Sequence, residues 1–138
     1  MYLLDTNTVS ELRKLPTGRA NPGVAAWSAA VRPSDLHLSV VTLQELAYGV
    51  LMMERRDPAQ GAVLRRWLDV QIVPEFRRRT FPIDPAVALR CASLHVLNRR
   101  PVLDALIAAT ALVHGLTVVK RNVSDFAPMG VPLLDPWA

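Results

Sequence analysis

The chain has 138 residues, and half of them are hydrophobic, which predicts one folded domain, residues 1–138, and excludes a largely disordered protein. No apolar run is long enough to span a membrane, and the N-terminus lacks the basic region of a signal peptide. The single cysteine, Cys91, excludes an internal disulfide and a cysteine-rich zinc cluster, so a reducing cytoplasm is the expected location.

The net charge is +4, and 14 of the 16 basic residues are arginine. Guanidinium forks suit phosphate recognition. Any one pair of adjacent arginines is explained equally well by a solvated helix face and an arginine-rich genome. The segment 55–79 as a whole is basic enough to favour nucleic acid or an acidic protein as a partner. The arginine clusters are Arg55-Arg56, Arg65-Arg66, Arg77-Arg78-Arg79 and Arg99-Arg100.

Strand and helix patterns alternate along the chain, which predicts an α/β fold with a parallel sheet. In the first half, N-cap residues after a short apolar run start one helix, and Thr42-x-x-Glu45 fits a capping box that opens another. The elements predicted there are a strand at 2–4, a helix from 5 to about 13, a loop at 15–23, a helix at 24–31, a strand at 36–41, a helix from 42 to about 54 and a helix from 58 to 72.

In the second half, Pro85 can start a helix that places Val87, Cys91 and Leu94 on its inner face, with Leu97 near the edge of that face. Gly115 follows the most apolar helix as its C-terminal cap. The elements predicted there are an edge strand at 81–83, helices at 85–97 and 101–114, and strands at 116–119 and 131–134.

Four of the twelve acidic residues lie in apolar or turn segments that ought to prefer neutral side chains: Asp5, Glu45, Asp104 and Asp125. A carboxylate near a core is costly unless it is paired, hydrogen-bonded or bound to a metal. Each of the four lies near the end of a predicted strand or the start of a predicted helix, and ligands bind outside the carboxyl ends of parallel strands. We therefore expect all four to face one edge of the sheet.

Carboxylates held close together repel and raise one another's pKa, and a hard divalent cation relieves that repulsion. Mg²⁺ or Mn²⁺ fits an all-oxygen donor set, whereas the lack of a histidine or cysteine cluster argues against zinc. Such a site suits phosphodiester chemistry, because the metal polarises a phosphate oxygen and lowers the pKa of bound water.

Each acid also has a purely structural alternative. Asp5 can be an N-cap, Glu45 the second half of a capping box, and Asp104 a first-turn acid favoured by the helix dipole. Asp125 can be a turn residue, and its loop could aim Asn122 inward in its place. Four independent structural roles would have to coincide to bring these acids to one edge of the sheet, so one shared site is the better explanation.

Polar neighbours of the acids are candidates for supporting roles. Thr6 and Asn7 could orient Asp5 by hydrogen bonds, and Asn122 could do so for Asp125. Thr42 lies near the expected end of the second strand. We expect Lys120 and Arg121 to contact phosphate, with a solvated position as the alternative.

Four segments resemble the motifs of PIN-domain proteins, and of the VapC and FitB-like toxins in particular. They are Met-Tyr-Leu-Leu-Asp-Thr-Asn-Thr-Val-Ser-Glu-Leu at the start, Leu-Ser-Val-Val-Thr-Leu-Gln-Glu-Leu-Ala-Tyr-Gly at 38–49, Asp-Ala-Leu-Ile-Ala-Ala-Thr-Ala at 104–111, and Thr-Val-Val-Lys-Arg-Asn-Val-Ser-Asp-Phe at 117–126. Each motif alone is weak, but all four in this order are strongly specific.

The resemblance implies a single PIN-like domain, residues 1–138: a three-layer sandwich with a central parallel sheet of four to five strands flanked by helices. It implies a Mg²⁺- or Mn²⁺-dependent endoribonuclease with Asp5, Glu45, Asp104 and Asp125 as the acidic site. It also implies a toxin inhibited by a small DNA-binding antitoxin, a homodimer, and possible larger complexes with the antitoxin. Lys120 stands where many relatives have threonine, which favours one metal ion over two.

Two other functions stay open from the residues alone. In a haloacid-dehalogenase-like phosphatase, Asp5 would be the nucleophile, but the second aspartate two residues later is missing and the chain is short for that fold. A non-catalytic nucleic-acid-binding module would use the same basic surface without the chemistry.

Overall fold

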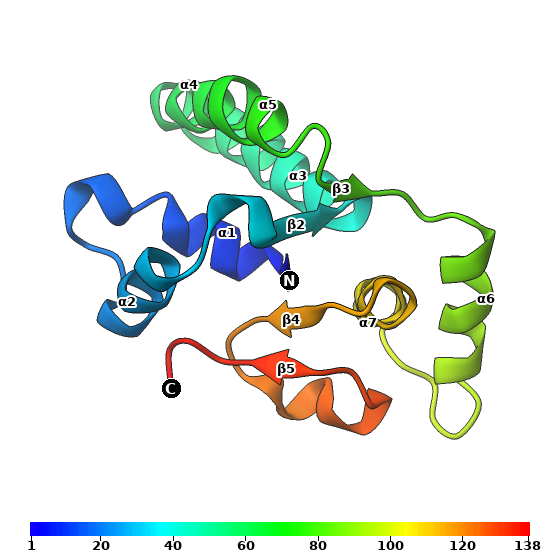
Figure 1. Cartoon of the computed structure of the whole chain (residues 1–138). Helices are drawn as coiled ribbons and strands as arrows, with labels where there is room; N and C mark the ends of the chain where they lie inside the picture. Colours follow the sequence, from blue (N-terminus) through cyan, green and yellow to red (C-terminus); the bar gives the residue numbers. More distant parts are fainter.

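The computed structural model describes residues 1–138 and contains a five-stranded sheet in the order β3-β2-β1-β4-β5 (Figure 1). Every neighbouring pair of strands is parallel, which confirms the predicted α/β fold with a central parallel sheet. The strands are β1 (Tyr2–Leu4), β2 (Leu36–Ser39), β3 (Thr80–Phe81), β4 (Thr117–Val119) and β5 (Leu133–Leu134).

Helices connect the strands and cover the sheet. The α-helices are α1 (Thr6–Leu12), α2 (Pro22–Ala30), α3 (Val40–Arg56), α4 (Pro58–Arg66), α5 (Val73–Glu75), α6 (Pro85–Leu94) and α7 (Val102–His114). A π-helical turn at Trp67–Ile72 joins α4 to α5, and short 3-10 turns lie at Leu15–Thr17, Pro33–Asp35, Val123–Asp125 and Ala127–Met129. None of the helices combines the length and apolarity needed to cross a membrane.

Successive residues of the central strands face opposite sides of the sheet, so the sheet separates two cores. Leu3 and Val118 pack with α6, α7 and the segment after β4, whereas Leu4 and Val119 pack with α1, α3 and the π-helical turn. Figure 1 shows α3, α4 and α5 gathered on one side of the sheet, with α7 beside β4 and α6 beyond it. The predicted three-layer sandwich is therefore confirmed.

The candidate site lies at the carboxyl edge of the sheet. β1 lies at the centre, with β2 on one side and β4 on the other, so the strand order reverses between β1 and β4. Asp5 follows β1 directly, and Lys120 follows β4 directly. In an open parallel sheet this reversal point is where ligands bind.

The start of α3 differs from the prediction. The second strand ends at Ser39 rather than at Val41, and the Ser39 hydroxyl caps α3 by accepting a hydrogen bond from the Val41 amide. The predicted Thr42-x-x-Glu45 capping box is therefore wrong, because both residues lie inside the helix. Serine is a strong N-cap residue, so α3 begins after Ser39 and not at Thr42.

Two other predicted helices also end at different residues. The helix from Pro58 was expected to reach Ile72; it continues through the π-helical turn to Glu75 and buries Leu68 on the sheet. The helix from Pro85 ends at Leu94, so Leu97 is not on its edge and is 92% exposed.

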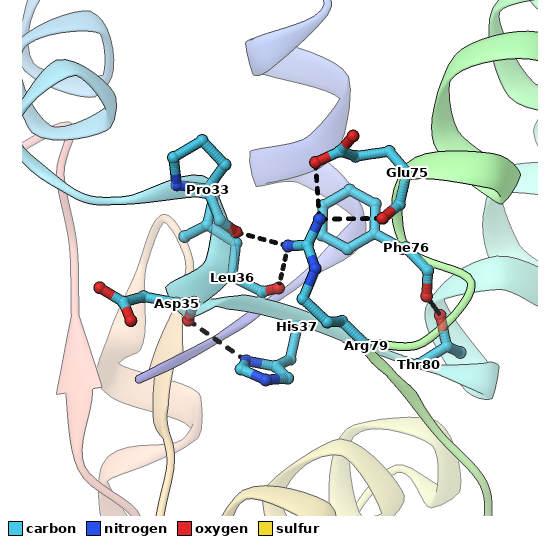
Figure 2. Close-up of polar contacts among 8 residues, drawn as sticks. All are labelled: Pro33, Asp35, Leu36, His37, Glu75, Phe76, Arg79 and Thr80. Carbon is cyan, nitrogen blue, oxygen red and sulfur yellow. Dashed lines mark hydrogen bonds and ion pairs between the residues drawn. The ribbon is translucent and has the colours of Figure 1, made fainter.

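The amino edge of the sheet is held by one arginine. Figure 2 shows the guanidinium of Arg79 between β2 and α5, where it donates hydrogen bonds to the carbonyls of Pro33 and Leu36 and to Glu75. The guanidinium carbon also lies 4.8 Å from the ring centre of Phe76. This arginine of the basic segment is therefore committed to the fold, not to a ligand.

Candidate active site

Asp5 is 8% exposed and has two tasks. Its Oδ1 caps α1 by accepting hydrogen bonds from the Thr8 amide at 2.9 Å and the Thr8 hydroxyl at 2.8 Å. The same hydroxyl lies 2.8 Å from the Val119 carbonyl, so Thr8 ties the carboxylate to the end of β4. Asp5 is therefore an N-cap, but its role is not purely structural, because the capping carboxylate also lines an acidic cavity.

Burial raises the pKa of Asp5 above its usual value of 3.8. The hydrogen bonds from Thr8 and the charge of Lys120 oppose that rise, whereas the neighbouring charge of Glu45 adds to it. The balance leaves this carboxylate harder to ionise than an exposed one, and a bound cation would favour its charged form.

Glu45 projects from the second turn of α3. Its Oε1 accepts a hydrogen bond of 2.8 Å from the hydroxyl of Thr6 on α1. Thr6 was expected to orient Asp5, and this prediction is wrong. The Thr6 hydroxyl instead orients Glu45 and joins α1 to α3. The residue that orients Asp5 is Thr8, which was not among the predicted residues. Its position three residues after an N-cap aspartate could have identified it, because the side chain of an N-cap residue bonds to that amide.

Asp104 lies in the first turn of α7, as expected, and its side chain makes no hydrogen bond to the protein. Burial raises its pKa, the nearby charges of Asp125 and Glu45 raise it further, and only Lys120 opposes them. Asp104 is therefore a half-buried carboxylate without a partner of its own, which argues for a ligand and against a purely solvated role.

Asp125 lies in the turn after β4 and is paired with a lysine. Its Oδ1 accepts a hydrogen bond of 3.0 Å from the Lys120 ammonium, which is itself 7% exposed. Asp125 lines the cavity, whereas the Asn122 side chain does not, so it is Asp125 and not Asn122 that this loop aims inward. Asn122 instead adopts a left-handed backbone with φ of 58° and offers its carbonyl to Lys120.

The four carboxylates meet in one cavity of about 260 Å³ at the carboxyl edge of the sheet. They come from the end of β1, from α3, from α7 and from the turn after β4, segments up to 120 residues apart. The lining residues are Asp5, Thr6, Asn7, Glu45, Asp104, Ile107, Lys120, Asp125 and Phe126. The convergence that the sequence predicted is present.

The donor set of this cavity fits a hard divalent cation. All its charged acceptors are carboxylate oxygens, and burial and neighbouring carboxylates raise the pKa values of two of the acids, Asp5 and Asp104. No three acidic, histidine or cysteine side chains converge tightly enough to chelate an ion by themselves. The arrangement therefore suits an ion that keeps several waters and is held by one or two carboxylates, as Mg²⁺ commonly is.

The remaining predicted residues have other positions. Thr42 is buried, and its hydroxyl lies 3.5 Å from the Leu4 carbonyl, so it packs α3 on the end of β1 and does not touch an acid. Asn7 lines the cavity without hydrogen-bonding to Asp5. Lys120 was expected to contact phosphate; its ammonium instead donates to the carbonyls of Arg121 and Asn122 and to Asp125.

A second, polar cavity adjoins the acidic one and shares Asn7 with it. Its wall includes Arg121, whose guanidinium has no hydrogen-bond or ionic partner, and the indole of Trp137. The C-terminal tail that carries Trp137 lies so close to α2 that a Cβ on Gly23 would collide with the Pro136 carbonyl oxygen. Glycine at this position therefore allows the tail to pack beside α2.

Comparisons with known proteins agree with this geometry. The family model described as PIN domain matches residues 2–129. The chain is 35% identical to Toxin FitB of Neisseria gonorrhoeae, over 99% of each chain, and 33% identical to VapC ribonuclease Y4jK of Sinorhizobium fredii, over 99% of this chain and 98% of that protein. A solved structure of FitAB bound to the IR36 DNA fragment matches with a TM-score of 0.87 and 31% identity, over 100% of this chain and 96% of that one.

Proposed function

This chain belongs to the PIN-domain family, and we propose that it is a Mg²⁺- or Mn²⁺-dependent endoribonuclease. The observation that carries the proposal is the meeting of four carboxylates, from four separate segments, in one cavity at the carboxyl edge of the sheet. The rhizobial relative is named a ribonuclease, which supports RNA as the substrate. We place its action in the cytoplasm, where RNA is available and Cys91 stays reduced.

Asp5, Glu45 and Asp104 are the side chains that would hold the cation, one or two of them directly and the others through its waters, with Asp125 beside them. A bound divalent cation would polarise the phosphate and lower the pKa of water. The protein's own contribution is positioning: Thr8 fixes the Asp5 carboxylate against β4, and Thr6 fixes the Glu45 carboxylate against α1. Asp104 makes no hydrogen bond to the protein, so its carboxylate would be free to bind the cation or to accept a hydrogen bond from the attacking water.

We propose that RNA crosses the acidic cavity and continues into the adjoining polar cavity. The polar cavity is lined by two cations, Lys14 and Arg121. Lys14 is paired with Glu11, so Arg121 is the one without an acidic partner. A guanidinium can bind a phosphate with two hydrogen bonds, and the Trp137 indole offers a surface on which a base can stack. Five arginines in the 55–79 segment that lack acidic partners add positive charge: Arg55, Arg56, Arg66, Arg77 and Arg78.

We propose further that the protein is the toxin of a toxin–antitoxin pair with a small DNA-binding antitoxin. The gonococcal relative is named a toxin, and the FitAB structure contains a DNA fragment. Homodimers, and larger complexes with the antitoxin, are part of this proposal. The apolar residues exposed around the start of α7 and along α3 supply a surface for a second copy. They are Tyr48, Leu51, Met52, Val102 and Leu103.

RNA cleavage by the purified protein tests the proposal. With Mn²⁺ we expect cleavage of a labelled RNA, and we expect none in EDTA. Asp104→Asn should slow cleavage by about 100-fold or more, because it removes a carboxylate that would bind the cation or the attacking water and breaks no hydrogen bond within the protein. Asp69→Asn is the matched control, since Asp69 is an exposed acid outside the cavity, and it should cleave at the wild-type rate.

Two results would contradict the proposal. Equal cleavage by wild type and Asp104→Asn would show that the acidic cavity is not where the chemistry occurs. Binding of RNA without cleavage, in Mn²⁺, would support the non-catalytic binding module instead. The phosphatase alternative has lost its basis, because the chain belongs to a different family.

A further inference from the structure

Lys120 differs from every other lysine and arginine in the molecule, because it alone is buried. It is 7% exposed and lines the acidic cavity. A buried ammonium costs several kcal/mol unless it is paired and fully hydrogen-bonded. The surroundings of this side chain therefore have to supply both a counter-ion and acceptors.

The ammonium uses all of its hydrogens within the protein. It donates to the Arg121 carbonyl at 3.1 Å, to the Asn122 carbonyl at 2.9 Å and to Asp125 Oδ1 at 3.0 Å. It also lies 4.6 Å from the ring centre of Phe126. An ammonium has three donors and no acceptor, so none is left for a substrate phosphate. Lys120 can therefore act on the site only through its fixed charge.

The charges around the cavity limit what else can bind. Four carboxylates and one ammonium give this wall a formal charge of −3. One divalent cation would bring that charge to −1, whereas two would reverse it to +1. Asp125 already has a cationic partner, which leaves Asp5, Glu45 and Asp104 for a metal ion.

We propose that the Lys120 ammonium takes the place of a second divalent cation, so that the cavity binds one ion and Asp125 serves as the counter-ion of the lysine. The inference rests on the proposed function for the presence of a divalent ion, and it adds the number of ions and the use of Asp125. The favourable interactions of Lys120 with both Asp5 and Asp104 support it, because one fixed cation then relieves repulsion among the acids before an ion binds.

Calorimetric titration of the metal-free protein with MnCl₂ counts the ions directly and needs no RNA. We expect one Mn²⁺ per wild-type chain. Lys120→Thr frees Asp125 and should raise the stoichiometry to two, and Asp125→Asn in the same chain should return it to one. Lys120→Met keeps the buried volume and removes the charge; it should also bind two ions, the first about tenfold more tightly than wild type.

Arg121→Met is the matched control, because it removes the neighbouring cation, which is exposed and unpaired. This variant should keep one ion, with an affinity within about threefold of wild type, since exposed charges are screened by solvent. Circular dichroism checks that each variant is folded before it is titrated.

The outcomes separate the two proposals. Two ions in the wild type, or one ion in folded Lys120→Thr and Lys120→Met, would overturn the role of Lys120 while leaving a metal-dependent ribonuclease intact. No Mn²⁺ binding by the wild type would overturn the metal dependence in the proposed function, and the Lys120 inference with it.

Discussion

The two edges of the sheet treat charge in opposite ways. At the amino edge, the Arg79 guanidinium meets two backbone carbonyls, the Glu75 carboxylate and the face of Phe76. At the carboxyl edge, Asp104 makes no hydrogen bond, and its pKa is raised by burial and then by the carboxylates around it. The first edge supplies its cation with an acidic partner and backbone acceptors, whereas the second has more negative charge than its single lysine can balance.

This difference separates a charge that serves the fold from charges that serve a ligand. A charged group with a complete set of partners stabilises the native state, and its removal leaves those partners unsatisfied. Charged groups with an incomplete set destabilise the native state slightly, and the free energy is recovered when the missing partner binds.

Arg79→Ala should lower the free energy of unfolding by about 3 kcal/mol, because it strands the carbonyls of Pro33 and Leu36 and removes the pairing of Glu75. Urea unfolding measures the loss. Arg78→Ala, at an exposed neighbour, should change stability by less than about 0.5 kcal/mol. Similar losses in both variants would mean that the amino edge does not depend on this arginine.

Mn²⁺ should stabilise the wild-type protein by about 2.7 kcal/mol at a concentration 100-fold above its Kd, because the ion binds the folded state alone. Asp104→Asn should be stabilised much less at the same concentration, since it lacks one of the carboxylates for the ion. Thermal unfolding with and without EDTA gives both values. An equal shift in the two proteins would place the ion somewhere other than this cavity.

Thr8→Val should cost about 1 kcal/mol, because it removes the hydroxyl that lies between Asp5 and the Val119 carbonyl. The same change should raise the pKa of Asp5 further, since that hydrogen bond lowers it. Thr6→Val is the control: it releases half-buried Glu45 and leaves Asp5 untouched, so it should cost less. Chemical denaturation at neutral pH compares the two, and a larger loss for Thr6→Val would contradict the assignment.

The pH dependence of stability should show the smallest effect. Burial raises the folded-state pKa of Asp5 above 3.8, so Asp5 costs no stability below that pH and an increasing amount as the pH rises through the folded-state value. Metal-free Asp5→Asn avoids this cost, so it should lose less stability than wild type as the pH rises from about 4 toward neutrality. Denaturation at a series of pH values measures it, and identical profiles would contradict the raised pKa.

The sequence predicted the sheet and the meeting of the four acids because both follow from chain order. Short apolar runs define parallel strands, and a residue that follows such a strand has to lie at the carboxyl edge. Asp5 and Asp125, which follow β1 and β4, could therefore be placed without any knowledge of their neighbours. The hydrogen-bond partners could not, because each depends on how a helix turns after its cap.

Ser39 and Thr42 illustrate that limit. Both residue types cap helices, and only the position where β2 stops decides between them. That shift of three residues changed Glu45 from a capping residue into an interior helix residue held by Thr6. Lys120 illustrates the same limit for charge: sequence shows a cation beside a polar loop, but only the left-handed turn at Asn122 shows that its ammonium is already satisfied.

The pairing of β1 with β4 has a consequence during protein synthesis. Asp5 is among the first residues to leave the ribosome, yet its strand gains a neighbour on one side only when residues 117–119 have been made. Lys120 and Asp125 follow later still, so a growing chain has no assembled acidic cavity. The acidic cavity can therefore assemble only when translation of the chain is nearly complete, so any chemistry that depends on it has to follow synthesis.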